Sequence, residues 1–303
     1  MELGLKVSGI YFKNPIITAS GTFGYGIEFL DYFDVNLLGG ITLKGISLNP
    51  KRGNPTPRIA ETDSGLINSI GLENIGFDEF IKTKLPIIRN KLTNTVIIAN
   101  VFGSTVEDYV KISEMFDNVP CISAIELNVS CPNVKEGGIA FGQDERVLGN
   151  LVKQVRKVVK NKKLIVKLSP NVSNISEFAY ISQEEGIDMV SLINTIRAMK
   201  IDIKTGKPIL ANIIGGLSGP AIKPIAIRMV YEVAKRVSIP IIGMGGVSRY
   251  EDVIEFLMAG ASLVSIGTQN LINPLSSLKI LNDFSDYIIT NKIKVSDLIG
   301  KAL

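Results

Sequence analysis

The sequence predicts a closed (β/α)8 barrel, and three observations lead to this fold class. Eight short runs rich in Ile and Val recur along the 303 residues, with amphipathic stretches between them. The runs are continuously apolar rather than alternating, which is typical of strands buried on both faces of a parallel sheet. Polar residues collect at the carboxyl ends of many runs, as at the catalytic mouth of a barrel. A doubly wound open sheet is the alternative, and the count of eight favours the barrel.

The expected strands and helices alternate along the chain. The strands are 15–20, 40–45, 95–103, 122–130, 163–170, 188–195, 238–246 and 261–268. Helical patterns cover 104–116, 143–160, 219–237 and 248–260. In the first of these, Ser104 is the expected N-cap and Glu107 stands at the third helical position, which is the arrangement of a capping box.

Three further segments complete the predicted architecture. Residues 3–15 are expected to form a short N-terminal β-hairpin at the bottom of the barrel. The connections 46–94 and 196–218 are too long for plain strand-to-helix loops, so we expect functional insertions at the carboxyl-terminal face. No repeat or linker interrupts the pattern, and residues 1–303 are expected to form one domain.

Composition excludes several classes of function. A 46% hydrophobic chain can bury a sizeable core, and a net charge of +4 with scattered basic residues predicts neither nucleic-acid nor membrane binding. Two cysteines, without a recognisable signal peptide or membrane span, favour the cytoplasm. Because histidine is absent, nucleophile systems and zinc sites that need it are excluded.

Polar side chains at the strand ends are the candidate functional groups. They are Ser20, Lys44, Asn100, Asn128, Lys167, Asn194 and Thr195. A single asparagine at a strand end is more often a turn residue, whereas several amides and two lysines at one mouth indicate a ligand site. Lys44 and Lys167 lie within apolar runs, and a buried ammonium needs an anionic or electron-rich partner.

Glycines at the ends of the last two expected strands indicate a phosphate-bearing ligand. Gly245, Gly246, Gly267 and Thr268 occupy the positions at which barrels often bind phosphate. The sequence GGLSGPA at 215–221 also precedes a helical pattern. Glycine lets backbone N–H groups approach phosphate oxygens, and the amino end of a helix favours the charge.

Cys131 lies in ELNVSCPNVKEGG, residues 126–138, just beyond the fourth expected strand. A strand over 122–129 would hold it more than ~20 Å from Cys121, whereas a disulfide needs Cα atoms within ~7 Å. No metal is expected, because neither cysteine has a second ligand at useful spacing. Cys121, at the start of the strand, suits a packing role. For Cys131 a proton-transfer role and a nucleophilic role both stay open.

Six sequence segments together resemble the dihydroorotate dehydrogenase family. They are NVSCPN with the following VKEGG (128–138), NSIGLEN (68–74), TASGTFGYG (18–26), LINT (192–195), GGLSGPAIKP (215–224) and GMGGV (243–247). They stand in the family's order over nearly the whole chain. The resemblance implies a flavin-dependent (β/α)8 barrel that oxidises (S)-dihydroorotate to orotate in de novo pyrimidine (UMP) biosynthesis.

The resemblance also indicates a subclass. Cys131, in place of the serine of the membrane-associated class, and the following NVKEGG are similar to the NAD-linked class 1B rather than the fumarate-linked class 1A. Class 1B implies a partner subunit that carries FAD and an iron–sulfur cluster, in a heterotetramer of two catalytic and two electron-transfer chains. This sequence has no GxGxxG fingerprint and too few cysteines to hold a cluster, which agrees with such a division.

Site residues follow from the same resemblance. FMN would be held by Ser20, Lys44, Gly45, Asn100, Asn128, Lys167, Ile193, Gly219, Gly245, Gly246, Gly267 and Thr268. Dihydroorotate would be held by Lys44, Asn68, Ser69, Ile70, Gly71, Leu72, Asn128, Asn194 and Thr195. Cys131 is implied as the base that removes the C5 proton while hydride passes from C6 to flavin N5. Lys167 is implied as the cation that stabilises negative charge near N1 and O2 of the reduced flavin.

Other functions fit parts of the pattern. A dihydropyrimidine dehydrogenase-type flavin barrel would act on a substrate that lacks the carboxylate. A flavin-free barrel lyase or isomerase would use the glycines for substrate phosphate and a lysine for Schiff-base chemistry. A barrel that serves only as a scaffold for a partner is least favoured, because it would not need a mouth ringed by polar groups.

Overall fold

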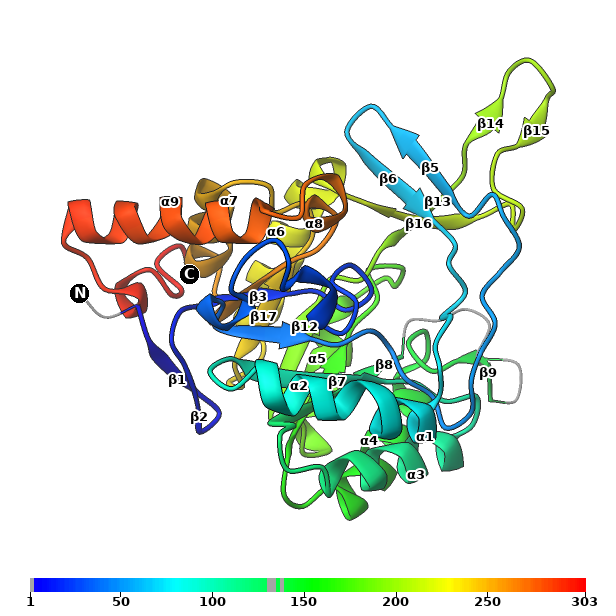
Figure 1. The fold of residues 1–303 in the computed structure, drawn as a ribbon, viewed down its shortest axis with the longest axis horizontal. Coiled ribbons are helices and arrows are strands. Elements are labelled where there is room, and N and C mark those ends of the chain that lie inside the picture. The colour runs from blue at the N-terminus through cyan, green and yellow to red at the C-terminus, as the bar shows by residue number, and fades with distance from the viewer. Residues whose placement is uncertain (1–2, 130–134, 137–138) are drawn as a thin grey trace.

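The computed structural model describes residues 3–129, 135–136 and 139–303, and its centre is a closed barrel of parallel strands (Figure 1). The strands are β3 (Ile16–Thr18), β4 (Gly40–Thr42), β7 (Val96–Val101), β8 (Ala124–Asn128), β11 (Lys163–Lys167), β12 (Met189–Leu192), β17 (Ile241–Met244) and β18 (Leu263–Ile266). Each pairs with the next one along the chain, and β18 closes on β3. The predicted fold class is confirmed, and each expected range contains one of these strands.

Helices follow the barrel strands and cover the outside of the sheet (Figure 1). They are α1 (Phe77–Glu79) with the π-helical turn η3 (Phe80–Lys84) and α2 (Leu85–Lys91), α3 (Val106–Asp117), α4 (Glu145–Val158), α5 (Ile175–Glu184), η4 (Pro220–Ile222) with α6 (Lys223–Ala234), α7 (Tyr250–Met258), α8 (Gln269–Ile272) and α9 (Ser276–Asn291). Short 3-10 turns are η1 (Ile27–Phe29), η2 (Val35–Leu37) and η5 (Val295–Asp297). The sequence patterns identified α3, α4, α6 and α7, but not α1, α2, α5, α8 or α9. None of the helices in the described ranges has the length and hydropathy of a membrane span.

The predicted start of α3 was wrong by one residue. Thr105 is the N-cap, and its Oγ1 accepts a hydrogen bond from the N–H of Asp108 at 3.2 Å. Asp108 Oδ2 accepts in return from the N–H of Thr105 at 3.2 Å, so Asp108 and not Glu107 completes the capping box. Ser104 and Thr105 are both capable of capping, and a start after Thr105 buries Val106 against the core.

The interior of the barrel is filled by side chains that alternate with those facing the helices. This interior cluster consists of Val7, Phe12, Ile17, Ala19, Ile98, Ala124, Ile165, Met189, Ile242, Met244 and Leu263. Val7 and Phe12 belong to the predicted N-terminal hairpin, formed by β1 (Leu5–Val7) and β2 (Ile10–Phe12). The fully buried Phe12 packs against the strand residues, so the hairpin closes the amino-terminal end of the barrel.

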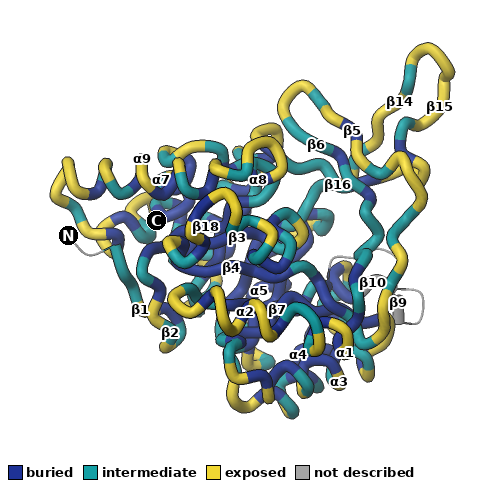
Figure 2. Tube along the Cα trace, viewed as in Figure 1, coloured by how far each residue is buried: buried dark blue, intermediate teal, exposed yellow. Residues whose placement is uncertain are grey.

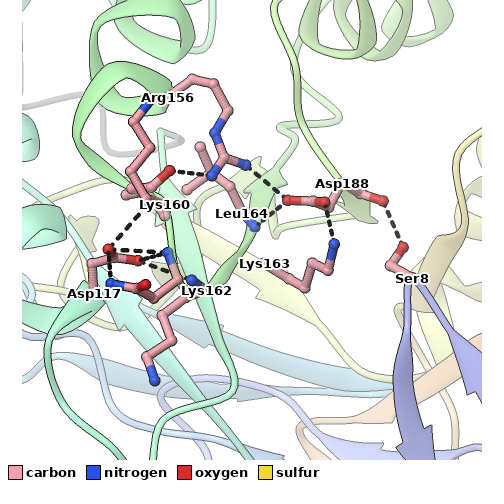
Figure 3. Close-up of polar contacts among 10 residues, drawn as sticks. Ser8, Asp117, Arg156, Lys160, Lys162, Lys163, Leu164 and Asp188 are labelled. Carbon is pink, nitrogen blue, oxygen red and sulfur yellow. Dashed lines mark hydrogen bonds and ion pairs between the residues drawn. The ribbon is translucent and has the colours of Figure 1, made fainter.

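Charged side chains secure the beginnings of the strands at the amino-terminal end, as Figure 3 shows. The carboxylate of Asp188, just ahead of β12, accepts hydrogen bonds from Arg156 and Lys163 at 2.9 and 3.0 Å. It also accepts from the N–H of Leu164 at 2.9 Å, and its backbone carbonyl accepts from Ser8 Oγ at 2.8 Å. This end of the barrel is therefore closed by apolar packing and ion pairs, which leaves the carboxyl ends of the strands for a site.

The two long connections meet in one antiparallel sheet, which we call the roof. Its strands are β5 (Ile59–Thr62) and β6 (Gly65–Asn68) from the first connection, and β13 (Ile196–Ala198) and β16 (Gly215–Ser218) from the second. Their order is β13-β16-β6-β5, so the two connections join through β16 and β6. A hairpin of β14 (Ile201–Asp202) and β15 (Lys207–Pro208) extends beyond the roof with an exposed tip (Figures 1 and 2). A separate pair, β9 (Lys135–Glu136) and β10 (Ile139–Ala140), follows β8. The insertions were predicted, whereas their pairing was not.

Candidate active site

A cavity of about 730 Å³ lies between the carboxyl ends of the barrel strands and the roof. All predicted site residues within the described ranges line it: Ser20, Lys44, Gly45, Asn68, Ser69, Ile70, Gly71, Leu72, Asn100, Asn128, Lys167, Ile193, Asn194, Thr195, Gly219, Gly245, Gly246, Gly267 and Thr268. Cys131, the predicted base, lies outside the described residues. The barrel thus brings together groups from the ends of all its strands and from both insertions.

The floor of the cavity is made by polar residues that continue the inward-facing rows of the strands. Asn100 follows the interior residue Ile98 by two positions, so both face the barrel axis. Lys167 lies in register with Asn128 on the neighbouring strand and is 6% exposed. Burial lowers the pKa of the Lys167 ammonium, and the negative charge of Glu126 acts in the opposite direction. The cavity therefore has a buried basic group with one identified acidic neighbour.

Glu126 is a buried carboxylate that the sequence analysis did not single out. It is 2% exposed, and its Oε1 accepts a hydrogen bond from Asn100 Nδ2 at 2.7 Å. Its Oε2 accepts from Ser191 Oγ, also at 2.7 Å. The available signal was an acidic residue in an apolar strand, two positions before Asn128. Polar residues at the ends of the expected strands do not include Glu126, because it lies one layer deeper in the barrel.

The amides of Asn128 and Asn194 lie side by side at the mouth of the barrel. Asn194 Nδ2 donates to Asn128 Oδ1 over 3.5 Å, and Asn194 Oδ1 accepts from the N–H of Thr195 at 2.9 Å. The hydroxyl of Tyr109 donates to the backbone carbonyl of Asn128 at 2.7 Å and so secures the end of β8. Paired amides offer both donors and acceptors, which suits a planar ring that carries carbonyl and N–H groups.

Two further asparagines support the predicted segments and were missed from sequence. Asn54 donates from its backbone N–H to the carbonyl of Ile70 at 3.0 Å and from Nδ2 to the carbonyl of Ser69 at 2.9 Å. Asn171 donates from Nδ2 to the carbonyl of Thr195 at 3.0 Å. Both line the cavity. Their roles depend on contacts between segments far apart in sequence, which no local pattern indicates.

Glycines form a tight backbone cradle at one end of the cavity. Gly246 has a φ of +81°, and a methyl group on it would come within 2.8 Å of the Gly219 carbonyl oxygen and 3.0 Å of the Lys223 backbone nitrogen. Thr268 Oγ1 donates to Ser218 Oγ at 2.8 Å, which ties the end of β18 to the roof. A Cβ would fill this cradle, so its glycines leave backbone groups accessible to a phosphate.

The composition of the cavity fits FMN. Within the described ranges, the buried Asn100 Oδ1 and Ser69 Oγ have no hydrogen-bond partner. A buried polar atom left unsatisfied costs about 1–3 kcal/mol, so a ligand that donates to Asn100 would recover stability. A planar heterocycle with polar edges and a phosphate would match the amides, the Lys167 ammonium and the glycine cradle together.

Cys121 lies away from the cavity and matches its predicted packing role. It is a free, half-buried thiol ahead of β8 that packs against the outer core. Burial raises the pKa of its thiol, so the unreactive protonated form is favoured.

The chain is similar in sequence to known proteins over nearly its whole length. A family model described as dihydroorotate dehydrogenase matches residues 2–288. The chain is 49% identical to the "dihydroorotate dehydrogenase B (NAD(+)), catalytic subunit" of Geobacter metallireducens, over 99% of this chain and 97% of that protein. It is also 49% identical to the protein of the same name from Thermodesulfovibrio yellowstonii, over 98% of each chain. A third such relative, from Geobacter sulfurreducens, is 48% identical over 99% of this chain and 97% of its own length.

Proposed function

The chain belongs to the dihydroorotate dehydrogenase family, and from this premise we propose that it is the catalytic subunit of an NAD-linked dihydroorotate dehydrogenase. It oxidises (S)-dihydroorotate to orotate in de novo pyrimidine (UMP) biosynthesis, as a single FMN-binding barrel domain over residues 1–303. The observation that carries this proposal is the convergence of a buried ammonium, an unpaired amide oxygen and a glycine cradle in one cavity.

The cofactor half of the cavity is assigned to FMN. Gly219, Gly245, Gly246, Gly267 and Thr268 hold its phosphate, and Ser20, Lys44, Gly45, Asn100, Asn128, Lys167 and Ile193 hold the rest. When bound, FMN supplies the acceptor for the hydride that leaves C6 of the substrate. The Lys167 ammonium provides positive charge in a site of low dielectric constant, where that charge acts strongly.

The substrate half of the cavity is assigned to dihydroorotate. Lys44, Asn68, Ser69, Ile70, Gly71, Leu72, Asn128, Asn194 and Thr195 hold it. Amide donors and acceptors from Asn128 and Asn194 match the ring carbonyls and N–H groups of a dihydropyrimidine. The Lys44 side chain, which also lines the cavity, offers a cation to the substrate carboxylate.

Cys131 is assigned as the base. It follows the cavity-lining Asn128 by three residues in the sequence, which supports this assignment. As a thiolate it takes the proton from C5 of the substrate while hydride leaves C6. A thiol with an ordinary pKa of about 8.5 does this with modest cost near neutral pH.

The electrons then leave through a separate chain. The curated relatives are named as the catalytic subunit of an NAD(+) enzyme, which supports a partner subunit that carries FAD and an iron–sulfur cluster. We assign two catalytic and two electron-transfer chains to the assembly, and a cytoplasmic location.

Anaerobic reduction of the purified protein tests the function. The protein is expected to be yellow with bound FMN, and its visible absorbance should bleach on addition of dihydroorotate but not of dihydrouracil. Equal bleaching by dihydrouracil would indicate the dihydropyrimidine dehydrogenase type. A colourless protein that takes up no FMN would favour the barrel lyase and contradict the proposal.

The electron acceptor is tested by purification with the native partners. Co-purification of a chain that contains FAD and iron–sulfur, together with NAD reduction by the complex, is the expected result. A catalytic chain that purifies alone and passes electrons to fumarate would instead assign the fumarate-linked class.

A further inference from the structure

We infer that Glu126 is a positioning residue of the cofactor site. It fixes the amide of Asn100 so that the unpaired oxygen is directed away from Glu126 and lies beside the cavity, and it holds a negative charge against the Lys167 ammonium. The inference rests on the proposed function, because FMN is the ligand that this arrangement would serve.

The orientation of Asn100 follows from what a carboxylate can do. An ionised carboxylate only accepts hydrogen bonds, so the atom that Asn100 turns toward Glu126 must be its Nδ2 donor. The other end of the amide, Oδ1, is then directed away from Glu126. A methyl group built on the cavity-lining Gly45 would lie 2.8 Å from that oxygen, which places Oδ1 beside the cavity. Asn100 therefore keeps a buried, unpaired acceptor next to the cavity wall.

The carboxylate is itself held from both sides. Asn100 lies in register with Glu126 on β7, and Ser191 Oγ donates to Oε2 from β12. Ser191 in turn lies in register with Lys167 on β11. Glu126 is thus enclosed by the strands that carry the functional groups, one layer below the mouth. It is not among the cavity-lining residues of the described ranges, so it acts through its neighbours.

A buried carboxylate is a costly way to fill a barrel. An apolar side chain of similar size would pack there without the penalty of removing a charge from water. The charge is compensated by two short hydrogen bonds and by the opposite charge of Lys167. The energetic cost of burying this carboxylate is explained if Glu126 sets the orientation of the Asn100 amide and favours the protonated form of Lys167.

The effect on Lys167 is electrostatic. Burial lowers the pKa of its ammonium, and the charge of Glu126 opposes that shift. The other charged residues of the described cavity lining are Lys44, Glu73 and Arg197. Glu126 lies below this lining, and its negative charge favours the protonated form of Lys167. Removing its charge should therefore let Lys167 lose its proton at lower pH.

The first test measures FMN affinity in Glu126→Gln, which keeps the shape and removes the charge. We expect the FMN dissociation constant to rise about tenfold, which is the scale of one charge-assisted hydrogen bond. Ser265→Ala is the matched control, because Ser265 is a buried residue on β18 whose side-chain hydroxyl makes no hydrogen bond within the described residues. The control should change the constant by less than about twofold, within the ordinary effect of a small substitution.

The second test asks whether Glu126 acts through Asn100. In an Asn100→Ala background, Glu126→Gln should change FMN affinity by clearly less than tenfold, because the part of its effect that acts through Asn100 is already lost. Fully additive effects would overturn the positioning role. If Glu126→Gln does not fold, Ser191→Ala replaces it in the same cycle, since it removes one donor to the carboxylate and keeps the charge. Its smaller loss of affinity must likewise shrink in the Asn100→Ala background.

The third test reads the charge on Lys167 through the flavin. Reduction of FMN would add negative charge near Lys167 and so raise the pKa of its ammonium. At a pH between the pKa with oxidised flavin and the pKa with reduced flavin, Lys167 therefore takes up one additional proton on reduction. Glu126→Gln should move that window to lower pH, so that within the shifted window the midpoint potential of bound FMN falls more steeply with pH than in wild type. Unchanged FMN affinity would overturn the role of Glu126 toward Asn100, and an unchanged potential profile would overturn its role toward Lys167. Wild-type protein that binds no FMN would instead contradict the proposed function.

Discussion

A single methyl group at Gly246 should weaken FMN binding, because this glycine stands where the backbone of the proposed phosphate site is tightest. The substitution Gly246→Ala places a Cβ 2.8 Å from the Gly219 carbonyl oxygen and 3.0 Å from the Lys223 backbone nitrogen. Ordinary contacts of a Cβ are 3.4–4 Å long, so one of these backbone segments must move by several tenths of an ångström. Both segments belong to the cradle proposed for the phosphate.

Gly246→Ala is expected to affect both folding stability and FMN binding. The positive φ of +81° costs an alanine about 1–2 kcal/mol of folding stability. Displacement of the cradle lengthens hydrogen bonds to the phosphate, and loss of one or two such bonds corresponds to about 1.5–3 kcal/mol of binding energy. The FMN dissociation constant should therefore rise by about 10- to 100-fold.

The assay is titration of apoprotein with FMN, followed by quenching of flavin fluorescence, with urea unfolding measured in parallel. Gly206→Ala is the matched control, because Gly206 has a φ of +69° but nothing within 4 Å of its built Cβ. It lies between β14 and β15, beyond the roof. The control should lose about 1–2 kcal/mol of stability and retain wild-type FMN affinity.

Two results would refute this reasoning. One is wild-type FMN affinity in Gly246→Ala, which would mean that the cradle does not hold the phosphate. The other is an equal loss of affinity in Gly206→Ala, which would mean that general backbone strain, and not the local contact, weakens binding.

Three further predictions follow from the site and the fold. Cys131→Ala should keep FMN but slow flavin reduction by dihydroorotate about 10²- to 10⁴-fold, measured by stopped flow. Wild-type turnover should rise with pH toward a thiol pKa of about 8.5. Unchanged flavin reduction in the variant would show that Cys131 is not the base. Burial raises the pKa of Asp252, but hydrogen bonds from Lys223 and from the backbone ahead of α7 outweigh it, and the pKa is lowered overall. Asp252→Asn should therefore lower the free energy of unfolding by about 2–4 kcal/mol at pH 7. A carboxylate with a lowered pKa contributes fully above its unfolded pKa, and the contribution is lost as pH falls toward the folded pKa, so the difference should shrink below about pH 4. A difference independent of pH would contradict this. Phe12→Ala, at the closed end of the barrel, should cost about 3–5 kcal/mol in urea unfolding, whereas the exposed Lys6→Ala in the same hairpin should cost less than about 0.5 kcal/mol.

The barrel could be predicted because its strands carry a local signal. Buried parallel strands are continuous apolar runs, and residues at their carboxyl ends meet at one mouth whatever the helices do. Lys44 and Lys167 were identified for the same reason, because an ammonium within an apolar run is conspicuous by itself. The cap of α3 was misplaced by one residue because Ser104 and Thr105 carry similar local signals, and only packing of Val106 distinguishes them.

What sequence reasoning missed depends on contacts across the fold. Glu126 was not identified because its meaning comes from Asn100 and Ser191, which lie 26 and 65 residues away. Asn54 was missed because its bonds to residues 69 and 70 exist only once the loop has closed. The pairing of the two insertions has the same origin, since neither β6 nor β16 shows which strand it will meet.

The roof has a consequence for the order in which the molecule folds and opens. Its central pair joins Asn68 and Gly216, which are 148 residues apart, whereas β5 and β6 form a local hairpin. Residues of the roof strands are mostly half-buried or exposed, whereas those of the barrel strands are mostly buried. Because less packing holds the roof, it should form after the barrel and open before it. In hydrogen exchange, amides between β16 and β6 should therefore exchange through a smaller opening free energy than those of the barrel strands. The same local opening would provide a route by which a ligand enters and leaves the cavity without unfolding of the barrel.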